Sequence, residues 1–470
     1  MLKLVLGASG SGKTTLLYAR IRARAEAGKR SILLVPEQFT SSTEARIYRE
    51  LGDALSGMVE SYSFTSLAEH ILAVEGGAAV QTLTDAGRAV LVRRALEELQ
   101  DNVHYYYRHR RSAAFCQMAA ETIDELKSAG LSGQQLQELA RDCGSESAKL
   151  GELALIFQGY ESLLAGTGMD PADRLELAAD RLEAALARDE LPDFLREREV
   201  FIDEFDTFNA PKKRLMGAML AALPAVTVAL CEDGAPMQPG DLELFSGAKQ
   251  VAAQLRQLAR KNGAQVAAPE LLRRDLRHKD APGLAALTEL LETGSCTPPE
   301  SAPELRLFAA ASREEEARCA AAAIRRLMRQ GVRCGKIAVV CRDISLYRAA
   351  VRYEFRMAEI PLYCDEPTTP EFSAPATAVR ALLALLRGAD MTEQLTVLAK
   401  TGLCDLTEPE VCALENYAYT WSPNAAAWRA EFTKSPRGFG DAELTEEDTQ
   451  NLTRAENARK KLVTAVDTLR

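Results

Sequence analysis

The sequence predicts an α/β fold built on a parallel sheet, and three observations support this prediction. Short apolar runs at 3–6, 31–35, 200–202 and 226–230 are typical of strands buried on both faces. Helical patterns separate these runs, and the first two lie one helix apart, as in a βαβ unit. A glycine-rich loop joins the first run to its helix.

The composition indicates a globular protein of more than one domain. The chain has 470 residues, of which 47% are hydrophobic and 26% charged, and this length favours two or three separate cores. The net charge of −10 gives no global basic field. This weighs only weakly against nucleic-acid binding, because a local basic groove can lie on an acidic protein.

The cysteines and the N-terminus indicate a reducing compartment. None of the ten cysteines forms a C-x-x-C pair, and their spacing resembles neither a disulfide framework nor a zinc site. The N-terminus leads directly into the strand 3–6, and no run of about 18 apolar residues is present to cross a membrane. We therefore expect a soluble, cytoplasmic protein without a membrane partner.

The strand patterns are interrupted once and then resume. A strand at 58–62 and a helix at 66–74 are followed by helical periodicity alone, until strands return near Glu199. A Pro-rich linker at 295–303 marks a domain boundary. After it, strands are expected at 305–308 and 337–340, with a helix between them.

These patterns divide the chain into four parts. The predicted parts are an α/β domain made of residues 1–83 and 190–295, a helical insertion at 84–189, the start of a second α/β domain at 304–375, and an incomplete helical region at 376–470.

The strongest motif is the loop from Gly7 to Thr14, which matches G-x-x-x-x-G-K-[ST] between a strand and a helix. Its glycines let backbone N–H groups turn toward phosphates at the positive end of the helix. We expect ATP here, with Lys13 on the β- and γ-phosphates and the Thr14 hydroxyl on Mg²⁺. The residues expected at the nucleotide are Gly7, Ser9, Gly10, Ser11, Gly12, Lys13, Thr14 and Thr15. The alternative is a Gly-rich turn with an incidental lysine.

Two carboxylates follow the strand at 200–202. Asp203 is expected to hold Mg²⁺, and Glu204 to orient or deprotonate the attacking water, so that Glu204 and Lys13 are the predicted catalytic residues. The alternative is a pair of acidic residues that merely ends a strand. The 190 positions between Lys13 and Asp203 favour a motor ATPase with an inserted domain over a small-molecule kinase.

The segment Ile202–Phe208 resembles the Walker B region of the UvrD/Rep-type superfamily 1 helicases, and the P-loop with Thr14-Thr15 is similar to theirs. The segments 35–40 and 61–68 lie where that group contacts single-stranded DNA. The early P-loop, Pro36-Glu37-Gln38 and the Ser-Phe-x-x-Leu-Ala pattern together most resemble the AddB family, one of the two components of bacterial AddAB helicase–nucleases.

This resemblance implies a RecA-like P-loop NTPase sheet with a large helical insertion and a partial second α/β motor domain. It implies processing of DNA double-strand ends in recombinational repair, with a helicase–nuclease partner subunit of AddA type. Arg342 would either reach the γ-phosphate or pair with a carboxylate such as Asp343. Two roles stay open for the next five residues, contact with DNA and plain packing in the core: Gln38, Phe39, Thr40, Tyr62 and Phe64.

Some features of the group are not matched. There is no room before Gly7 for an adenine-reading glutamine, and no clear third-motif glutamine follows Cys231-Glu232-Asp233. The resemblance places an arginine finger, the nuclease domain and iron–sulfur cysteines beyond residue 470. Three functions stay open: an ATP-hydrolysing subunit, a DNA-binding scaffold with a structural ATP site, and a P-loop small-molecule kinase.

The segment His104–Arg111, of sequence HYYYRHRR, mixes aromatic and basic side chains. Surfaces that stack bases and contact phosphates have this composition. The alternative is a helix with its aromatic residues inward and its arginines solvated.

Overall fold

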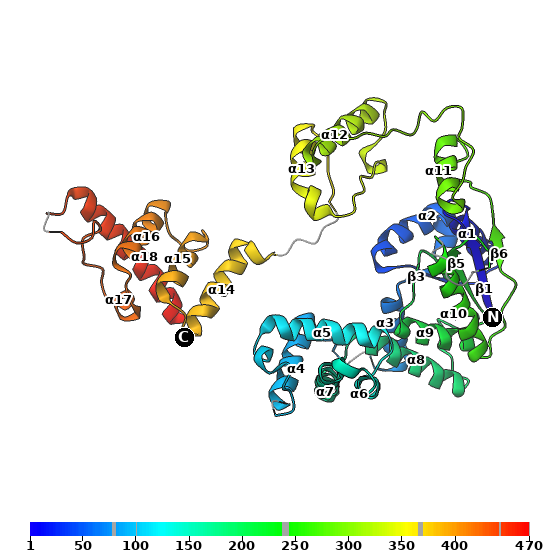
Figure 1. Ribbon diagram of the computed structural model, residues 1–470, viewed down its shortest axis with the longest axis horizontal. Helices are drawn as coiled ribbons and strands as arrows, with labels where there is room; N and C mark the ends of the chain where they lie inside the picture. The colour runs from blue at the N-terminus through cyan, green and yellow to red at the C-terminus, as the bar shows by residue number, and fades with distance from the viewer. Residues whose placement is uncertain (78–80, 100, 237–243, 365–369, 441–442, 470) are drawn as a thin grey trace. The chain divides into compact units, whose positions relative to one another are not determined.

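Parallel strands form the only sheet among the residues that the structure describes (Figure 1). The computed structural model describes residues 1–77, 81–99, 101–236, 244–364, 370–440 and 443–469. The strand order is β3-β2-β4-β5-β1-β6, and every pairing is parallel. The strands are β1 (Leu2–Gly7), β2 (Ser31–Leu34), β3 (Val59–Tyr62), β4 (Glu199–Ile202), β5 (Ala225–Cys231) and β6 (Glu270–Leu272).

Both faces of the sheet are buried, which explains the uninterrupted apolar runs of its strands. Successive side chains alternate between faces. Val5, Leu33 and Phe201 pack against α1 (Lys13–Glu26) and α2 (Thr40–Ser56). Their strand neighbours pack on the opposite face against four helices: α3 (Phe64–Glu75), α8 (Pro171–Ala187), α9 (Ala210–Ala222) and α10 (Ser246–Lys261).

The predicted helical insertion contains a bundle with its own core, which includes Phe115, Phe157 and Tyr160. The last helix of the predicted range behaves differently, because Ala178 and Leu182 of α8 belong to the core of the sheet. The helices of the separate bundle are α4 (Asp85–Glu98), α5 (Ala113–Ser128), α6 (Gly133–Ala140) and α7 (Ser147–Leu164).

The edge strand β6 is absent from the sequence-based prediction. It has three residues, none of them fully buried, so it lacks the apolar run that identifies the central strands. It pairs with β1 from Val5 to Gly7, directly before the glycine-rich loop. The chain then passes this loop and enters α11 (Pro282–Thr293).

The chain divides into two units, residues 1–307 and 308–470. The second unit is helical over its described residues. One apolar cluster joins α12 (Arg313–Arg329) to α13 (Ile344–Met357). Another surrounds Trp428, and its helices are α14 (Ala374–Leu386), α15 (Met391–Lys400), α16 (Glu408–Trp421), α17 (Ala425–Arg429) and α18 (Glu446–Thr468).

The strands predicted at 305–308 and 337–340 are not formed. These segments are described, but no strand lies beside them among the described residues, and an isolated extended segment has no backbone partners. Leu307 is 102% exposed and Val340 is 90% exposed. The apolar pattern is therefore present in the sequence, but it does not produce a sheet in this chain.

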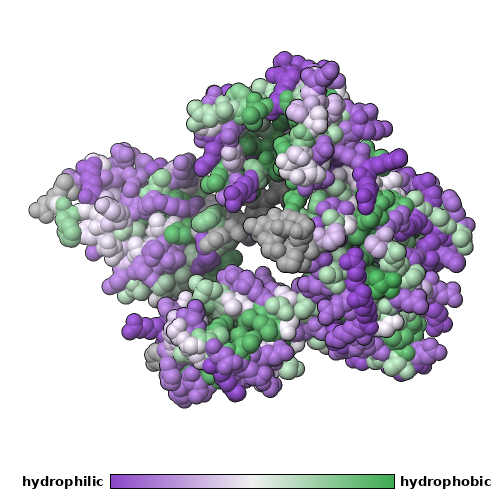
Figure 2. Space-filling view, turned by 45° about the vertical axis from the view of Figure 1, so that its right-hand side comes forward, coloured by the Kyte–Doolittle hydropathy of each residue, from purple (hydrophilic) through white to green (hydrophobic). Residues whose placement is uncertain are grey.

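No helix formed by the described residues is both long enough and apolar enough to cross a membrane. The face seen in Figure 2 is largely hydrophilic, with its apolar residues in separate patches.

Candidate functional site

The glycine-rich loop lies between β1 and the first turn of α1, at the carboxyl edge of the sheet. Gly10 and Gly12 have φ angles of 83° and 92°, a left-handed conformation that favours glycine. Gly12 is the N-cap of α1, and no side chain caps this helix. The first turn of α1 therefore has no capping side chain among the described residues, which suits an anion site at a helix N-terminus.

The polar groups of the loop fit a triphosphate. The Lys13 ammonium donates hydrogen bonds to the carbonyl oxygens of Gly7 (2.7 Å) and Ala8 (2.8 Å), so it lies folded onto its own loop. Burial lowers the pKa of Lys13, while Cys231 and Asp203 act in the opposite direction. The Ser11 Oγ atom is buried and has no hydrogen-bond partner among the residues that the structure describes, which is costly unless a ligand or water supplies one.

The two carboxylates lie at the end of β4. Asp203 is buried, its N–H donates to the Leu34 carbonyl of β2, and its Oδ1 accepts from the Glu204 N–H at 3.0 Å. Glu204 has a φ angle of 65°, an uncommon conformation that often marks a functional constraint in a non-glycine residue. Burial and the neighbouring Asp203 raise the pKa of Glu204, while Arg46 opposes this.

The carboxylates and the loop face one pocket of about 520 Å³. Lys13, Thr14, Thr15, Asp203 and Glu204 all line it. The fold thus brings together residues that lie far apart in the sequence.

Thr14 and Asp203 offer one hydroxyl and one carboxylate to a cation in this pocket. The described residues contain no group of three His, Cys, Asp or Glu side chains arranged to hold a metal ion. A small protein share of the ligands suits Mg²⁺, which usually keeps several waters and binds phosphate oxygens.

A turn after β6 covers the loop, and sequence reasoning missed it. The Leu276 N–H donates to the Gly10 carbonyl at 3.0 Å, and Arg277 Nη1 donates to Ser9 Oγ at 3.1 Å. Asp275 holds the turn, because its Oδ1 accepts from the N–H groups of Arg277 and His278. Arg277 lines the same pocket as Lys13. The basic run at 273–278 was the available signal, but no pattern linked it to the loop.

A third cation reaches the pocket from α2. The Arg46 guanidinium lies 4.8 Å from the ring centroid of Tyr18 and lines the pocket beside Glu204. Arg46 also lines a second pocket of about 600 Å³, together with Gln38, Phe39 and Glu204. The segment predicted to contact DNA and the predicted catalytic carboxylate of Glu204 therefore line the same pocket.

The five residues considered for DNA contact differ in exposure. Gln38 and Phe39 are exposed in a single 3₁₀ turn, Glu37–Phe39, and the Thr40 hydroxyl donates to the Glu37 carbonyl. Tyr62 is half-buried, and its hydroxyl donates to the Glu60 carboxylate at 2.8 Å.

Phe64 is fully buried, with its ring edge-on to Phe205 and Phe208. For Phe64 the core-packing alternative therefore applies, because a buried ring offers no face to a base. Arg342 is exposed in the second unit, and its role toward the γ-phosphate stays a prediction.

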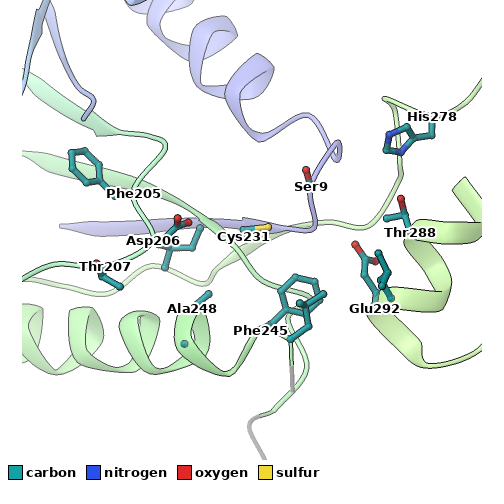
Figure 3. Close-up of a pocket in the computed structure, with 14 residues that line it drawn as sticks. Ser9, Phe205, Asp206, Thr207, Cys231, Phe245, Ala248, His278, Thr288 and Glu292 are labelled. Atoms are coloured by element: carbon teal, nitrogen blue, oxygen red, sulfur yellow. The ribbon is translucent and has the colours of Figure 1, made fainter. Parts of the chain in front are cut away.

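A further pocket of about 530 Å³ adjoins the loop at Ser9 and is mainly apolar. Figure 3 shows Ser9 on the loop, opposite Thr288 and Glu292 of α11, with Phe245 below. Asp206 and Cys231 line both this pocket and the one that holds Lys13.

The model of the family described as "ADDB, N-terminal" matches residues 4–288. The chain is also similar to curated proteins that are named as the B component of an ATP-dependent helicase/deoxyribonuclease. The protein from Desulforudis audaxviator is 32% identical over 91% of this chain and 37% of its own length. The one from Moorella thermoacetica is 31% identical over 91% of this chain and 38% of its own. A protein from Clostridium perfringens is 27% identical over 99% of this chain and 41% of its own length. The chain thus spans about two fifths of the length of these relatives.

Proposed function

Because this chain belongs to the AddB N-terminal family, we propose that it is the ATP-binding part of a helicase–deoxyribonuclease subunit. The name of the relatives supports an ATP-dependent activity on DNA. We further propose that the whole protein acts on double-strand ends in recombinational repair, in the cytoplasm, with a partner subunit of AddA type.

The observation that carries the proposal is the unsatisfied polar interior of the loop. Within the described parts of the chain, the buried Ser11 hydroxyl has no partner, and the hydrogen bonds of the Lys13 ammonium go to carbonyl oxygens of its own loop. Phosphate oxygens would supply acceptors to both groups, at the N-terminus of α1 where negative charge is favoured.

Each residue has a role in this proposal. Lys13 and Arg277 neutralise phosphate charge, and Thr14 and Asp203 hold Mg²⁺, which would stabilise the charge that develops on the phosphoryl oxygens. Glu204 orients the attacking water. Its backbone is fixed by the Asp203 carboxylate, so its side chain starts from a defined position beside the pocket.

A second candidate is a DNA-binding scaffold whose ATP site is structural. The segment after β5 favours it, because Cys231-Glu232-Asp233 contains no glutamine that would contact both nucleotide and DNA. This candidate requires ATP binding without turnover. The small-molecule kinase is disfavoured, because relatives named as a helicase/deoxyribonuclease component match 91–99% of this chain.

Steady-state ATP turnover with and without single-stranded DNA tests the proposal, with Lys13→Ala as the comparison. DNA-stimulated turnover that needs Mg²⁺ and is lost in Lys13→Ala supports the hydrolysing protein. Tight ATP binding without turnover supports the scaffold. Turnover that is independent of Mg²⁺, or unaffected by Lys13→Ala, contradicts both.

A further inference from the structure

The basic and aromatic segment at 104–111 is unused by the proposed nucleotide site. It lies in the helical bundle, between the end of α4 and the start of α5. His104, Tyr105, Arg108, His109 and Arg111 are exposed. Only a single 3₁₀ turn, Tyr107–His109, is formed here, so the segment is a surface turn, and the helix of the alternative interpretation is not formed.

A buried carboxylate fixes this turn. Glu152 of α7 is 9% exposed, and its Oε1 accepts hydrogen bonds from the N–H groups of His104 (2.7 Å) and Tyr105 (2.6 Å). Its Oε2 accepts from the Tyr106 N–H at 3.1 Å. A buried charge is costly unless it is satisfied in this way, and charge-assisted bonds are the stronger kind. Three consecutive residues are thereby held in place.

The two tyrosines of the turn point in different directions. Tyr106 packs inward on Phe115, with ring centroids 5.1 Å apart. Tyr105 meets Tyr106 edge-on at 79° and remains 60% exposed. Core packing therefore accounts for Tyr106, but it leaves an exposed aromatic ring at Tyr105 on a rigid backbone.

Positive charge lies in the same turn as this ring. Arg108 and Arg111 are exposed, and in the part of the chain that the structure describes neither pairs with a carboxylate. Arg111 directly precedes Ser112, the N-cap of α5, where the helix dipole adds positive potential. Within this 470-residue chain of net charge −10, the turn is a local cationic surface.

We propose that the turn 104–111 is a contact surface for single-stranded DNA. The Tyr105 ring stacks on an unpaired base, and Arg108 and Arg111 contact phosphates on either side of it. A fixed aromatic ring beside cations suits single strands, because every base offers a face for stacking. The inference rests on the proposed function for DNA as the partner, but it adds a surface outside the nucleotide pocket.

Fluorescence anisotropy with a labelled oligo-dT tests this proposal. Tyr105→Ala is expected to weaken binding about tenfold, and Tyr105→Phe to retain affinity because it keeps the ring. The double variant Arg108→Ala/Arg111→Ala should weaken binding and reduce the slope of log K against log salt by about 1.4.

Matched controls are available on the same chain. Tyr419 is 89% exposed on α16, and Arg93 and Arg94 are exposed on α4 of the same bundle. Tyr419→Ala should leave DNA affinity unchanged, and Arg93→Ala/Arg94→Ala should leave the salt slope unchanged. Circular dichroism of each variant checks that the helices are intact.

Wild-type affinity in Tyr105→Ala and in the arginine double variant overturns the inference, as does equal competition by a poly-glutamate peptide. Absence of oligo-dT binding also overturns it. In that case the proposed function would still stand if the wild type binds ATP and Lys13→Ala does not. Conversely, the expected DNA pattern without any ATP binding would keep this surface and contradict the nucleotide site.

Discussion

Arg277 Nη1 donates a hydrogen bond of 3.1 Å to Ser9 Oγ, across 268 positions of sequence. The bond connects the turn after the edge strand to the phosphate loop after β1. Arg277 thus joins Lys13 of the loop and Arg46 of α2 as a third cation in one pocket. Arg277 is therefore in place to exchange its serine partner for a phosphate oxygen.

Arg277→Ala should weaken ATP binding at least about tenfold, because hydrogen bonds to charged groups are worth about 1.5–3 kcal/mol. Binding of a fluorescent ATP analogue measures this. Arg260→Ala, on the exposed end of α10, is the control and should bind as the wild type does. Equal affinity in both variants would remove Arg277 from the site.

Glu204→Gln should abolish any turnover and leave ATP affinity within about threefold of the wild type, since the change removes a base and keeps the shape of the side chain. Single-turnover hydrolysis and equilibrium binding separate the two effects. Asp193→Asn, at an exposed position before β4 and outside this pocket, is the comparison and should retain turnover. Full turnover in Glu204→Gln would show that the Glu204 carboxylate is not the group that orients the attacking water.

Gly10→Ala should lose nucleotide binding as well as stability. The added Cβ would lie 2.8 Å from the Arg277 Cβ and 2.9 Å from Asp275 Oδ1, so the covering turn must shift. Gly28→Ala is a matched control, because Gly28 has a φ of 72° but nothing within 4 Å. Both should lose about 1–2 kcal/mol of unfolding free energy from the left-handed backbone.

Thermal denaturation and ATP titration of the two glycine variants make the comparison. Normal ATP affinity in Gly10→Ala would show that the turn at 275–278 moves freely and does not shape the site.

Glu199 links three strands and gives stability a pH dependence. It accepts hydrogen bonds from Lys3 Nζ and Thr227 Oγ1, both at 2.8 Å. Burial alone would raise the pKa of Glu199. The hydrogen bonds from Lys3 and Thr227 lower the pKa by more than burial raises it, so the net pKa is below the ordinary 4.5. A depressed folded-state pKa stabilises the protein above about pH 4.5, and this contribution is lost as the pH falls through the folded-state value.

Glu199→Gln should therefore cost about 2 kcal/mol at pH 7, and the difference from the wild type should shrink below about pH 4.5. Urea denaturation at several pH values measures it. Glu97→Gln removes an exposed partner of Arg93 and should cost under about 0.5 kcal/mol. A constant difference at all pH values would contradict the assignment.

The central strands could be predicted from sequence because residues such as Val5, Leu33 and Phe201 are buried on one face while their neighbours are buried on the other. The loop and the Asp203-Glu204 pair could be predicted because the chemistry restricts residue type. The edge strand β6 and Arg277 could not, since an edge strand needs no apolar run, and Arg277 reaches the loop only through tertiary pairing of β6 with β1.

The remaining errors have physical causes as well. Phe64 lies in a motif with polar neighbours, but the N-cap at Ser63 turns its ring into the core. The runs at 305–308 and 337–340 are apolar enough for strands, yet a strand also requires a neighbour, and the local sequence does not state whether one is present.

Equilibrium binding of an ATP analogue to the wild type and to Lys13→Ala, with and without Mg²⁺, tests whether the loop from Gly7 to Thr14 is a nucleotide site. We predict saturable, Mg²⁺-strengthened binding in the wild type and a loss of at least about tenfold in Lys13→Ala. Wild-type affinity in Lys13→Ala, or no binding by either protein, would contradict a nucleotide site on this loop.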